Sequence, residues 1–434
     1  MERRFAERKR EIEDDAKIDP KALSGCVRRL QQFGKPYFEH FRRSETRDHA
    51  QRFLEGLLSD LPRKNVESIA YRYEQDRRAL QRFVGETVWE HKVLLKRLAE
   101  QVANEIGEAD GILAFDPSGF EKDGKMSAGV ARQWLGRFGK VDNGQVGTFM
   151  AYATRKEHAL VNVRLFIPQE WNDDGARCKR ARIPEKEYKK HKTRHQHCLE
   201  MYKEQGKLLP HKYVTGDSEL GKSSGFRRAL RKLKVKYVLA IPCNTLVCDL
   251  EEYSGHGVPP KEAFVRVDQW RTSLTDADWQ VIDVRDGEKG PIVRKLAMCR
   301  VLAHTERNRK DACPELLIVT ERPDGNGVKY DYYLSNVMDE SAEELTRVIV
   351  ASHRVEDCFR RAKDACGLAD YEVQTWYGWH HHITMSMLAC WFLTQETMRR
   401  KKGGCIVNGA IVAALGRGAT TPLCDSSSTQ LVAL

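Results

Sequence analysis

The sequence predicts an α/β fold in which a layered core is interrupted by a β-rich insertion and preceded by helices. Three patterns along the chain carry this prediction. Apolar residues recur at helical spacing in residues 1–107, and short apolar runs bounded by polar turns follow in 108–244. Alternating apolar and polar residues with Asp-Gly and Asn-Gly turns then fill 245–336, before helical periodicity returns in 337–400. Residues 401–434 are a tail to which the pattern assigns no role.

Residues 1–107 are predicted to form a helical domain that binds DNA. Ala50, Phe53, Leu54 and Leu57 share one helical face, while the opposite faces carry many Arg and Lys side chains. Such a basic helical surface is typical of DNA-binding domains, but a solvated helical bundle shows the same pattern. Charge alone leaves both interpretations open.

The overall composition favours a polyanionic partner. The chain has 434 residues, a formal net charge of +11 and 41% hydrophobic residues, which is enough apolar content for a globular core. The first residues are charged, and the longest apolar run, 383–393, is too short to cross a bilayer. We therefore expect a cytoplasmic, nucleoid-associated protein that binds no membrane. The 12 cysteines form no Cys-x-x-Cys pair, which indicates reduced thiols.

The order of predicted strands and helices is that of an α/β layer. In the core, strands are predicted at 112–116, 146–154, 160–167, 212–215 and 237–241, with a basic helix at 226–234. A polar, basic stretch at 178–197 separates the third strand from the fourth. In the insertion and beyond it, strands are predicted at 263–267, 280–284 and 316–320, and helices at 342–366 and 376–398. This order predicts a sheet covered by helices.

Three acidic residues stand out by their positions. Asp116 and Asp217 each end a predicted strand, and Glu356 lies in the middle of a predicted helix. Strand ends in layered α/β folds open into clefts, and divalent cations need several carboxylate oxygens at one point. Together the three acids predict a two-metal site for phosphoryl chemistry. For each acid alone, a helix cap or a turn residue is the more common role.

A lysine shares the helical face of the predicted glutamate. Glu356 and Lys363 are seven residues apart, which places them about 20° apart around the helix, with Phe359 between them. A metal-binding carboxylate and a phosphate-binding ammonium would then face the same DNA backbone. An exposed charged helix with Phe359 as its core contact has the same pattern.

Longer stretches around these acids carry a family resemblance. They are 115–134, 136–146, 171–174, 214–217, 225–230, Glu356-x-x-Phe359-x-x-x-Lys363, 367–372 and 376–379. These stretches resemble the insertion-sequence transposases of the DDE class, over roughly residues 40–395. The resemblance implies an RNase H-like core in two parts, 108–244 and 337–400, with the β-rich insertion between them. It also implies that Asp116, Asp217 and Glu356 are catalytic and bind two Mg²⁺ ions, for which Mn²⁺ can substitute.

The resemblance further implies an activity and partners. Transposases of this class cleave DNA strands at transposon ends and transfer them to a target, in cut-and-paste transposition. The implied partners are double-stranded DNA with terminal inverted repeats and a second copy of the chain in a synaptic homodimer.

The helix around the glutamate departs from the pattern of related transposases. They carry Tyr-x-x-Arg-x-x-x-Glu at this place, whereas the Tyr and Arg positions here hold Ile349 and Ser352. Arg354 lies two residues further along, on a different helical face. Pro117 follows the first aspartate, where a second Asp is common. These departures support a second interpretation, a catalytically impaired DNA-binding protein derived from a transposase.

Basic and aromatic side chains are the predicted DNA contacts. The basic ones are Lys363, Arg360, Lys125, Arg132, Lys189 and Lys190. In related transposases a tryptophan of the insertion stacks on a flipped base at a DNA hairpin, which makes Trp270 and Trp279 the candidates here. Burial in the core of a small sheet is the slightly more common role for such tryptophans.

Two further motifs suggest other chemistry. The segment 216–223 matches the P-loop pattern, which makes a P-loop nucleotide hydrolase a minor alternative. However, Asp217 and Glu219 would place negative charge inside the phosphate cradle. The three histidines that follow Trp379 point in different directions on a helix, so we expect them to pack rather than to bind a metal.

Overall fold

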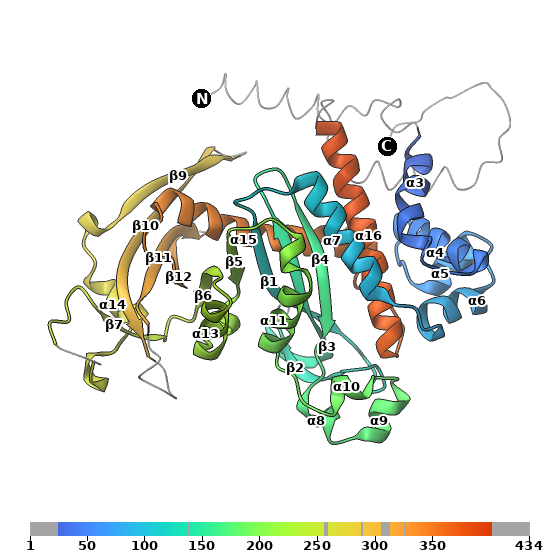
Figure 1. The fold of residues 1–434 in the computed structure, drawn as a ribbon, viewed down its shortest axis with the longest axis horizontal. Coiled ribbons are helices and arrows are strands. Elements are labelled where there is room, and N and C mark those ends of the chain that lie inside the picture. The colour runs from blue at the N-terminus through green and yellow to red at the C-terminus, as the bar shows by residue number, and fades with distance from the viewer. Residues whose placement is uncertain are drawn as a thin grey trace.

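A single mixed sheet runs through the molecule (Figure 1). The computed structural model describes residues 25–401, apart from 137–138, 256–258, 288–289, 305–312 and 325–326. Within these residues twelve strands form one sheet, with the order β2-β3-β1-β5-β6-β12-β11-β10-β7-β8, while β4 pairs with β3 and β9 with β10. The first residues of the predicted helical domain, the tail 402–434 and the turn at 325–326 lie outside the described residues.

The first half of the sheet combines antiparallel and parallel pairs. β3 pairs with β1, β2 and β4 in antiparallel register, and β5 pairs with β1 and β6 in parallel register. Their bounds are Ile112–Glu121 (β1), Ala131–Leu135 (β2), Lys140–Ala153 (β3), His158–Leu165 (β4), Tyr213–Gly216 (β5) and Lys236–Ile241 (β6). The predicted core strands are confirmed, and β2 is an additional short strand.

The insertion extends this sheet, because β12 pairs antiparallel with β6. Its strands are Leu246–Asp249 (β7), Val265–Arg266 (β8), Gln280–Gly287 (β9), Gly290–Ala303 (β10), Glu315–Asp324 (β11) and Gly327–Ser335 (β12). The predicted strand at 263–267 is largely wrong. Only two of its residues are extended, between the helical turns Lys261–Ala263 (η4) and Val267–Trp270 (α14). Two more turns, Arg271–Ser273 (η5) and Asp276–Asp278 (η6), lead to β9.

The sequence does not predict β10, the long central strand of the insertion. Both faces of this strand are covered. Leu296 packs in one hydrophobic cluster, whereas Cys299 and Val301 pack in another on the opposite side. A strand buried on both faces lacks the alternation that identifies half-buried strands.

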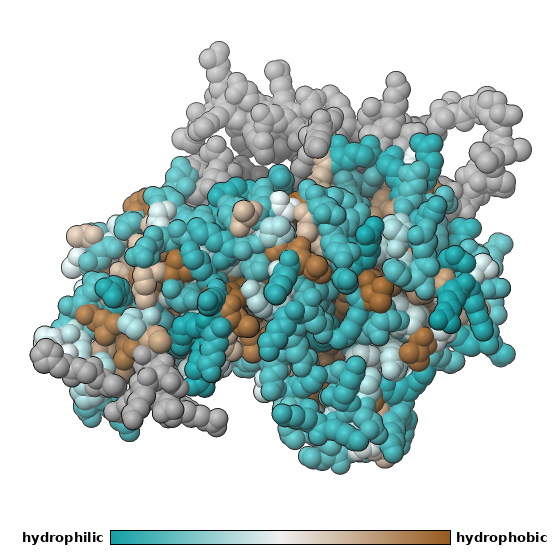
Figure 2. All heavy atoms as spheres, viewed as in Figure 1, coloured by the Kyte–Doolittle hydropathy of each residue, from teal (hydrophilic) through white to brown (hydrophobic). Residues whose placement is uncertain are grey.

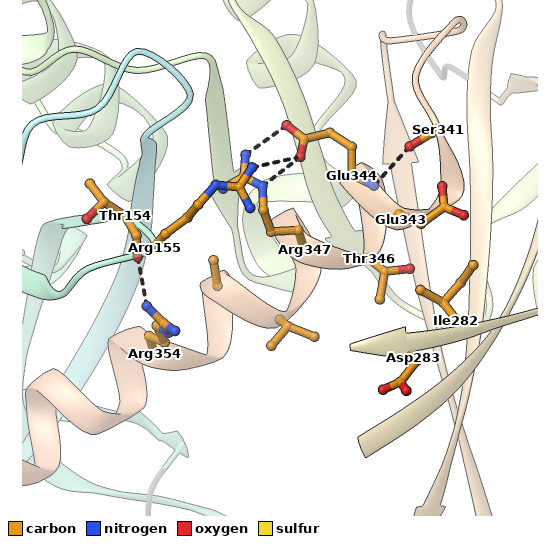
Figure 3. A pocket seen from close by; sticks show the side chains of 12 residues that line it. Thr154, Arg155, Ile282, Asp283, Ser341, Glu343, Glu344, Thr346, Arg347 and Arg354 are labelled. Carbon is orange, nitrogen blue, oxygen red and sulfur yellow. Dashed lines mark hydrogen bonds and ion pairs between the residues drawn. The ribbon is translucent and has the colours of Figure 1, made fainter. Parts of the chain in front are cut away.

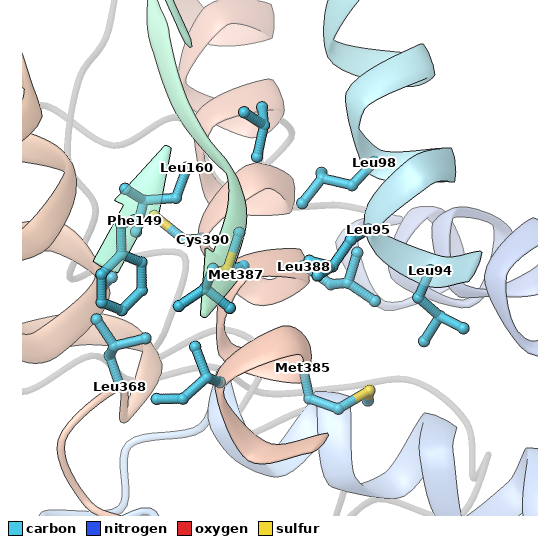
Figure 4. Packing of buried hydrophobic residues seen from close by; sticks show 14 of the residues in the cluster. Leu94, Leu95, Leu98, Phe149, Leu160, Leu368, Met385, Met387, Leu388 and Cys390 are labelled. Atoms are coloured by element: carbon cyan, nitrogen blue, oxygen red, sulfur yellow. The ribbon is translucent and has the colours of Figure 1, made fainter. Parts of the chain in front are cut away.

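The N-terminal helices share their core with the rest of the molecule. They are Cys26–Phe38 (α3), Ser44–Leu57 (α4), Val66–Arg72 (α5), Arg77–Gln81 (α6), Arg82–Glu86 (η1) and His91–Ile106 (α7). Figure 4 shows Leu94, Leu95 and Leu98 of α7 beside Met387 and Leu388 of α16 (Trp376–Lys401). One hydrophobic cluster includes these helices, strands β3 and β4, and α16. A separate helical domain ending at residue 107 is therefore not confirmed, and this boundary stays a prediction.

Helix α15 (Ala342–Cys366) connects the insertion to the core, and its bounds confirm the prediction. Ser341 caps its start by accepting a hydrogen bond from the backbone of Glu344, and Gly367 ends it with a φ of 64°. Leu345 and Val348 pack against the insertion, whereas Phe359 packs in the core cluster. The helix thereby carries its second half toward β1.

Short helices fill the connections around β5. Those before it are Gln169–Asn172 (α8), Gly175–Arg180 (α9), Glu185–Tyr188 (α10), Arg194–Gln205 (α11) and Gly206–Leu208 (η3), and those after it are Ser218–Lys222 (α12) and Ser224–Lys232 (α13).

No helix in the described part of the chain has the length and apolar character needed to cross a bilayer. Hydrophilic residues cover most of the face in Figure 2, with small separate apolar patches.

Candidate active site

The two aspartates occupy equivalent positions on neighbouring parallel strands. β1 and β5 pair in parallel register up to Phe115 and Gly216. The next residue on one strand is Asp116, and the next on the other is Asp217, which caps α12. Because paired strands lie about 4.8 Å apart, this register brings the two aspartates together where β5 ends.

The prediction that Asp116 ends a strand is wrong. β1 continues to Glu121, because its antiparallel pairing with β3 extends to the pair Glu121 and Gly144. Asp116 therefore lies in the middle of its strand, at the point where the parallel neighbour stops. The opening beside it comes from the end of β5.

All three acids line one cavity of about 910 Å³. Burial raises the pKa of Asp116 well above its ordinary value, and the negative charges of Asp217 and Glu356 raise it further. Burial also raises the pKa of Asp217, although the backbone N–H of Leu220 donates to its Oδ1 at 3.1 Å and opposes the rise. The cavity thus concentrates negative charge that is only partly compensated by the protein.

Glu356 lies at the mouth of the cavity. Its side chain is 79% exposed, and its Oε1 lies 3.9 Å from Nδ1 of His353, one turn earlier on α15. The nearby imidazole of His353 lowers the pKa of Glu356, and the charges of Arg322 and Lys329 in the insertion lower it further. The glutamate is therefore ionised at neutral pH and accessible to an approaching ligand.

Lys363 lies inside the same cavity, two turns after the glutamate. Its Nζ donates to Oγ of Ser118 on β1 at 2.9 Å and lies 5.8 Å from the ring of Phe359. Its charge lowers the pKa of Asp116, against the larger effect of burial. Arg360 lines the cavity as well, and the contact of Lys363 and Arg360 with DNA stays a prediction.

A model of the DDE superfamily endonucleases matches residues 36–291 of this chain. The chain belongs to this family. No curated protein matches it. Membership confirms the resemblance in the sequence and, with the sheet order described above, an RNase H-like core. It also makes the chain a nuclease-type enzyme, which acts on DNA.

In this DDE endonuclease, Arg354 does not take the place of the arginine that related transposases carry at the position of Ser352. Ile349 is 1% exposed and packs in the hydrophobic cluster with the insertion, and Oγ of Ser352 donates to its carbonyl oxygen at 2.6 Å. Arg354 faces a second cavity of about 510 Å³ on the other side of α15 (Figure 3). There its Nη1 donates to the carbonyl oxygen of Thr154 at 2.7 Å. Arg354 holds the turn between β3 and β4 and does not line the cavity of the acids.

Trp134 and Arg194 are among the side chains that line the cavity of the acids and that the sequence did not predict as site residues. Trp134 on β2 is 58% exposed, and Arg194 at the start of α11 forms an ion pair of 2.7 Å with Glu219. The register from β1 through β3 to β2 places Trp134 on the same face of the sheet as Asp116. Trp134 ends the first family-like stretch, and Arg194 lies in the basic stretch 178–197, so both lay within segments already singled out.

The other predicted DNA contacts do not line this cavity. Lys125, Arg132, Lys189 and Lys190 are exposed elsewhere on the surface, and Lys189 pairs with Glu185 at 2.6 Å. Their contact with DNA stays a prediction.

The tryptophans of the insertion lie away from the acids. Trp270 is 7% exposed in the hydrophobic cluster of the insertion, and its Nε1 donates to Oδ2 of Asp249 at 2.8 Å. Trp279 is half-buried against the same cluster and contacts Tyr330. The structure therefore gives no support to base stacking by Trp270, whose ring faces lie inside the protein.

The P-loop segment does not form a phosphate cradle. The carboxylate of Asp217 caps α12, where a phosphate would bind, and Glu219 is paired with Arg194. Family membership and this geometry leave nucleotide hydrolysis without support. The three histidines of α16 are buried and contact backbone oxygens or nitrogens, as expected for packing.

The chemistry of the acids fits a hard divalent cation. Carboxylate oxygens are the donors that Mg²⁺ and Mn²⁺ prefer. Burial and, after it, the negative charges of Asp217 and Glu356 raise the pKa of Asp116, and a bound cation would offset both effects. Among the described residues, however, no group of three or more His, Cys, Asp or Glu side chains is arranged to hold a metal ion. Convergence of the three carboxylates on a metal therefore stays a prediction.

Proposed function

We propose that the protein is a transposase that cleaves DNA strands at transposon ends and transfers them, with Asp116, Asp217 and Glu356 as its catalytic acids. The observation that carries the proposal is the single cavity that these acids line together with Lys363. The three acids come from a strand, from the residue after the neighbouring strand and from a helix, yet they line one cavity. This argues against three unrelated positions, although Asp217 also caps α12.

The proposed roles follow from the position of each side chain. Asp116 and Asp217 would hold the metal at the end of β5, and Glu356 would complete its ligands by turning from His353 into the cavity. When bound, Mg²⁺ or Mn²⁺ activates a water or 3′-hydroxyl and stabilises the leaving oxygen of the phosphodiester. Lys363, fixed by Ser118, would hold a non-bridging phosphate oxygen beside the aspartates.

Terminal inverted repeats and a synaptic homodimer belong to this proposal. The basic faces of residues 1–107 and 178–197 would bind the duplex. Their affinity for DNA would fall steeply with salt, because each neutralised phosphate releases counterions.

Nicking of a supercoiled plasmid in Mg²⁺ or Mn²⁺ tests the proposal. The wild-type protein is expected to convert the plasmid to the nicked form, while Asp217→Asn and Glu356→Gln fail to do so and still bind DNA. Asp357→Asn is the matched control, because Asp357 is the next residue of α15 and pairs with Arg360 outside the cluster of acids. Equal nicking by all four proteins would contradict the proposal.

The same assay decides the second candidate function, a catalytically impaired DNA-binding protein. Ile349 and Ser352 favour it, because they stand where related transposases have Tyr and Arg, and Ser352 lacks the charge of that Arg. DNA binding without nicking by the wild-type protein, in either metal, would support that function.

A further inference from the structure

Three cations form a row across adjacent strands of the insertion. Arg322 on β11 pairs in register with Lys329 on β12. Arg294 on β10 directly precedes Lys295, whose partner Glu321 directly precedes Arg322. In antiparallel strands this register places Arg294 opposite Arg322, so that all three cations lie side by side on one face. We call Arg294, Arg322 and Lys329 the basic row.

The protein compensates the charge of the basic row only in part. Like charges directly opposite each other on paired strands destabilise a sheet. Nε of Arg322 donates to Oδ2 of Asp331 at 2.9 Å. Nε and Nη1 of Arg294, in contrast, are buried and have no hydrogen-bond partner, and this burial lowers the pKa of Arg294. Unpartnered buried donors are costly and rare in folded proteins, so the Arg294 side chain would gain hydrogen bonds by turning outward to a phosphate.

The basic row lies on the face of the insertion that turns toward α15 and the acids. Side chains two or four residues apart on a strand share a face, so the row shares its face with Leu296, Ile318 and Tyr333. These three residues pack against Leu345 and Val348 of α15 in one cluster. The positive charges of Arg322 and Lys329 also lower the pKa of Glu356, which lines the cavity of the acids.

We propose that the basic row binds the phosphodiester backbone of the DNA strand that enters the cavity of the acids. This inference rests on the proposed function and names a binding site for its substrate. The guanidinium of an arginine forms charged hydrogen bonds to phosphate oxygens. The basic row would thereby contact a phosphate in place of the arginine that related transposases carry at the position of Ser352. The insertion then contributes cations to the DNA, while its tryptophans lie on the other face or in its core.

Salt-dependent DNA binding tests this proposal, with a control on the same strand. Lys295 follows Arg294, points to the opposite face and pairs with Glu321 at 3.2 Å. Binding of a fluorescein-labelled 30-base-pair duplex of arbitrary sequence would be measured by anisotropy, without divalent metal, across a series of KCl concentrations. The proteins compared are the wild type, Arg294→Gln, the double variant Arg294→Gln/Lys329→Gln and Lys295→Gln.

We expect the Kd of Arg294→Gln to rise about tenfold, as for the loss of a charged hydrogen bond. The slope of log K against log salt should fall by about 0.9 for each lost phosphate contact, so the double variant should lose about twice as much. Lys295→Gln should keep both the wild-type Kd and the wild-type slope. An unchanged slope in Arg294→Gln, or an equal loss in Lys295→Gln, would overturn the proposal.

Thermal stability separates a ligand-binding role from a structural one. Because Nε and Nη1 of Arg294 have no partner, Arg294→Gln is expected to melt at or above the wild-type temperature. A clear fall in melting temperature would show that Arg294 holds the fold and would overturn the proposal. Arg294→Lys keeps the charge but not the planar guanidinium, and should weaken binding while keeping the wild-type slope.

Plasmid nicking keeps this inference distinct from the proposed function. If the wild type does not nick DNA but Arg294→Gln lowers the salt slope, the proposed function fails and the basic row stands. If the wild type nicks DNA and Arg294→Gln binds like the wild type, the basic row fails and the proposed function stands.

Discussion

Replacement of Asp116 by Asn should stabilise the metal-free protein and remove its response to metal. The pKa of Asp116 is raised in the folded state above its ordinary value of 3.8, so the folded state holds this proton more tightly than the unfolded state. Its contribution to stability is therefore complete below the unfolded pKa and is lost as the pH rises through the folded pKa. Above that pH the wild type keeps a buried, repelled carboxylate, which Asn lacks. Without metal, Asp116→Asn should melt higher than the wild type at pH 8.

Bound metal should reverse the order of the two melting temperatures, so that the wild type melts above Asp116→Asn. A cation present at 100 times its Kd stabilises the folded state by about 2.7 kcal/mol. For 434 residues the entropy of unfolding is about 0.9 kcal/mol/K, so the melting temperature should rise by about 3 °C. The wild type should show this rise in Mn²⁺, and Asp116→Asn should show less than a third of it. Because the ligand must be deprotonated, the rise should also grow with pH as Asp116 ionises.

Differential scanning fluorimetry across Mn²⁺ concentrations at pH 6 and pH 8 measures both effects. Asp357→Asn is the control, because it removes one carboxylate from α15 outside the cluster of acids and should keep the wild-type response. The reasoning is refuted if Asp116→Asn melts below the wild type without metal, or if its response to Mn²⁺ equals that of the wild type.

Three further predictions concern other parts of the protein. Glu356→Gln should abolish plasmid nicking with less than about a twofold change in DNA affinity; nicking at the wild-type rate would exclude Glu356 from the chemistry. Trp134→Ala should weaken binding of a duplex with a five-nucleotide dT tail about tenfold, as expected for one lost base-stacking contact, whereas Trp134→Phe should keep most of the affinity. Equal affinities by anisotropy would argue against stacking. Trp270→Ala should cost about 3–5 kcal/mol in urea unfolding, because its indole fills the core of the insertion, and the folded variant should still bind DNA. A loss below about 1 kcal/mol would contradict that burial.

Local patterns predict those parts of the fold that depend on neighbouring residues. Helix α15 matches its predicted bounds because a serine cap and a left-handed glycine define its ends within the segment itself. Strand β10 is not predicted, since burial on both faces removes the alternation that periodicity detects. The single sheet through core and insertion depends on the pairing of β12 with β6, which no local pattern specifies.

In the candidate site, too, the sequence predicts the residues but not how they are arranged. The sequence identifies Asp116, Asp217 and Glu356 by their places on elements and by resemblance. Their common cavity depends on a parallel pairing between residues 101 positions apart, and only the structure reveals it. The position of Trp134 on the face of Asp116 depends on two antiparallel registers, and the burial of Trp270 on a hydrogen bond to a residue 21 positions earlier.

The central claim is tested most directly by a crystal structure. The crystals would be grown in Mn²⁺, and an anomalous difference map would be calculated from data collected at the manganese edge. The claim is that Asp116, Asp217 and Glu356 form one metal-dependent catalytic site. We expect one or two peaks between Asp116 and Asp217, with each metal about 2.2 Å from its carboxylate oxygens and Glu356 turned from His353 toward the metal. An ordered cavity without a manganese peak, at a Mn²⁺ concentration that supports nicking, would contradict the claim.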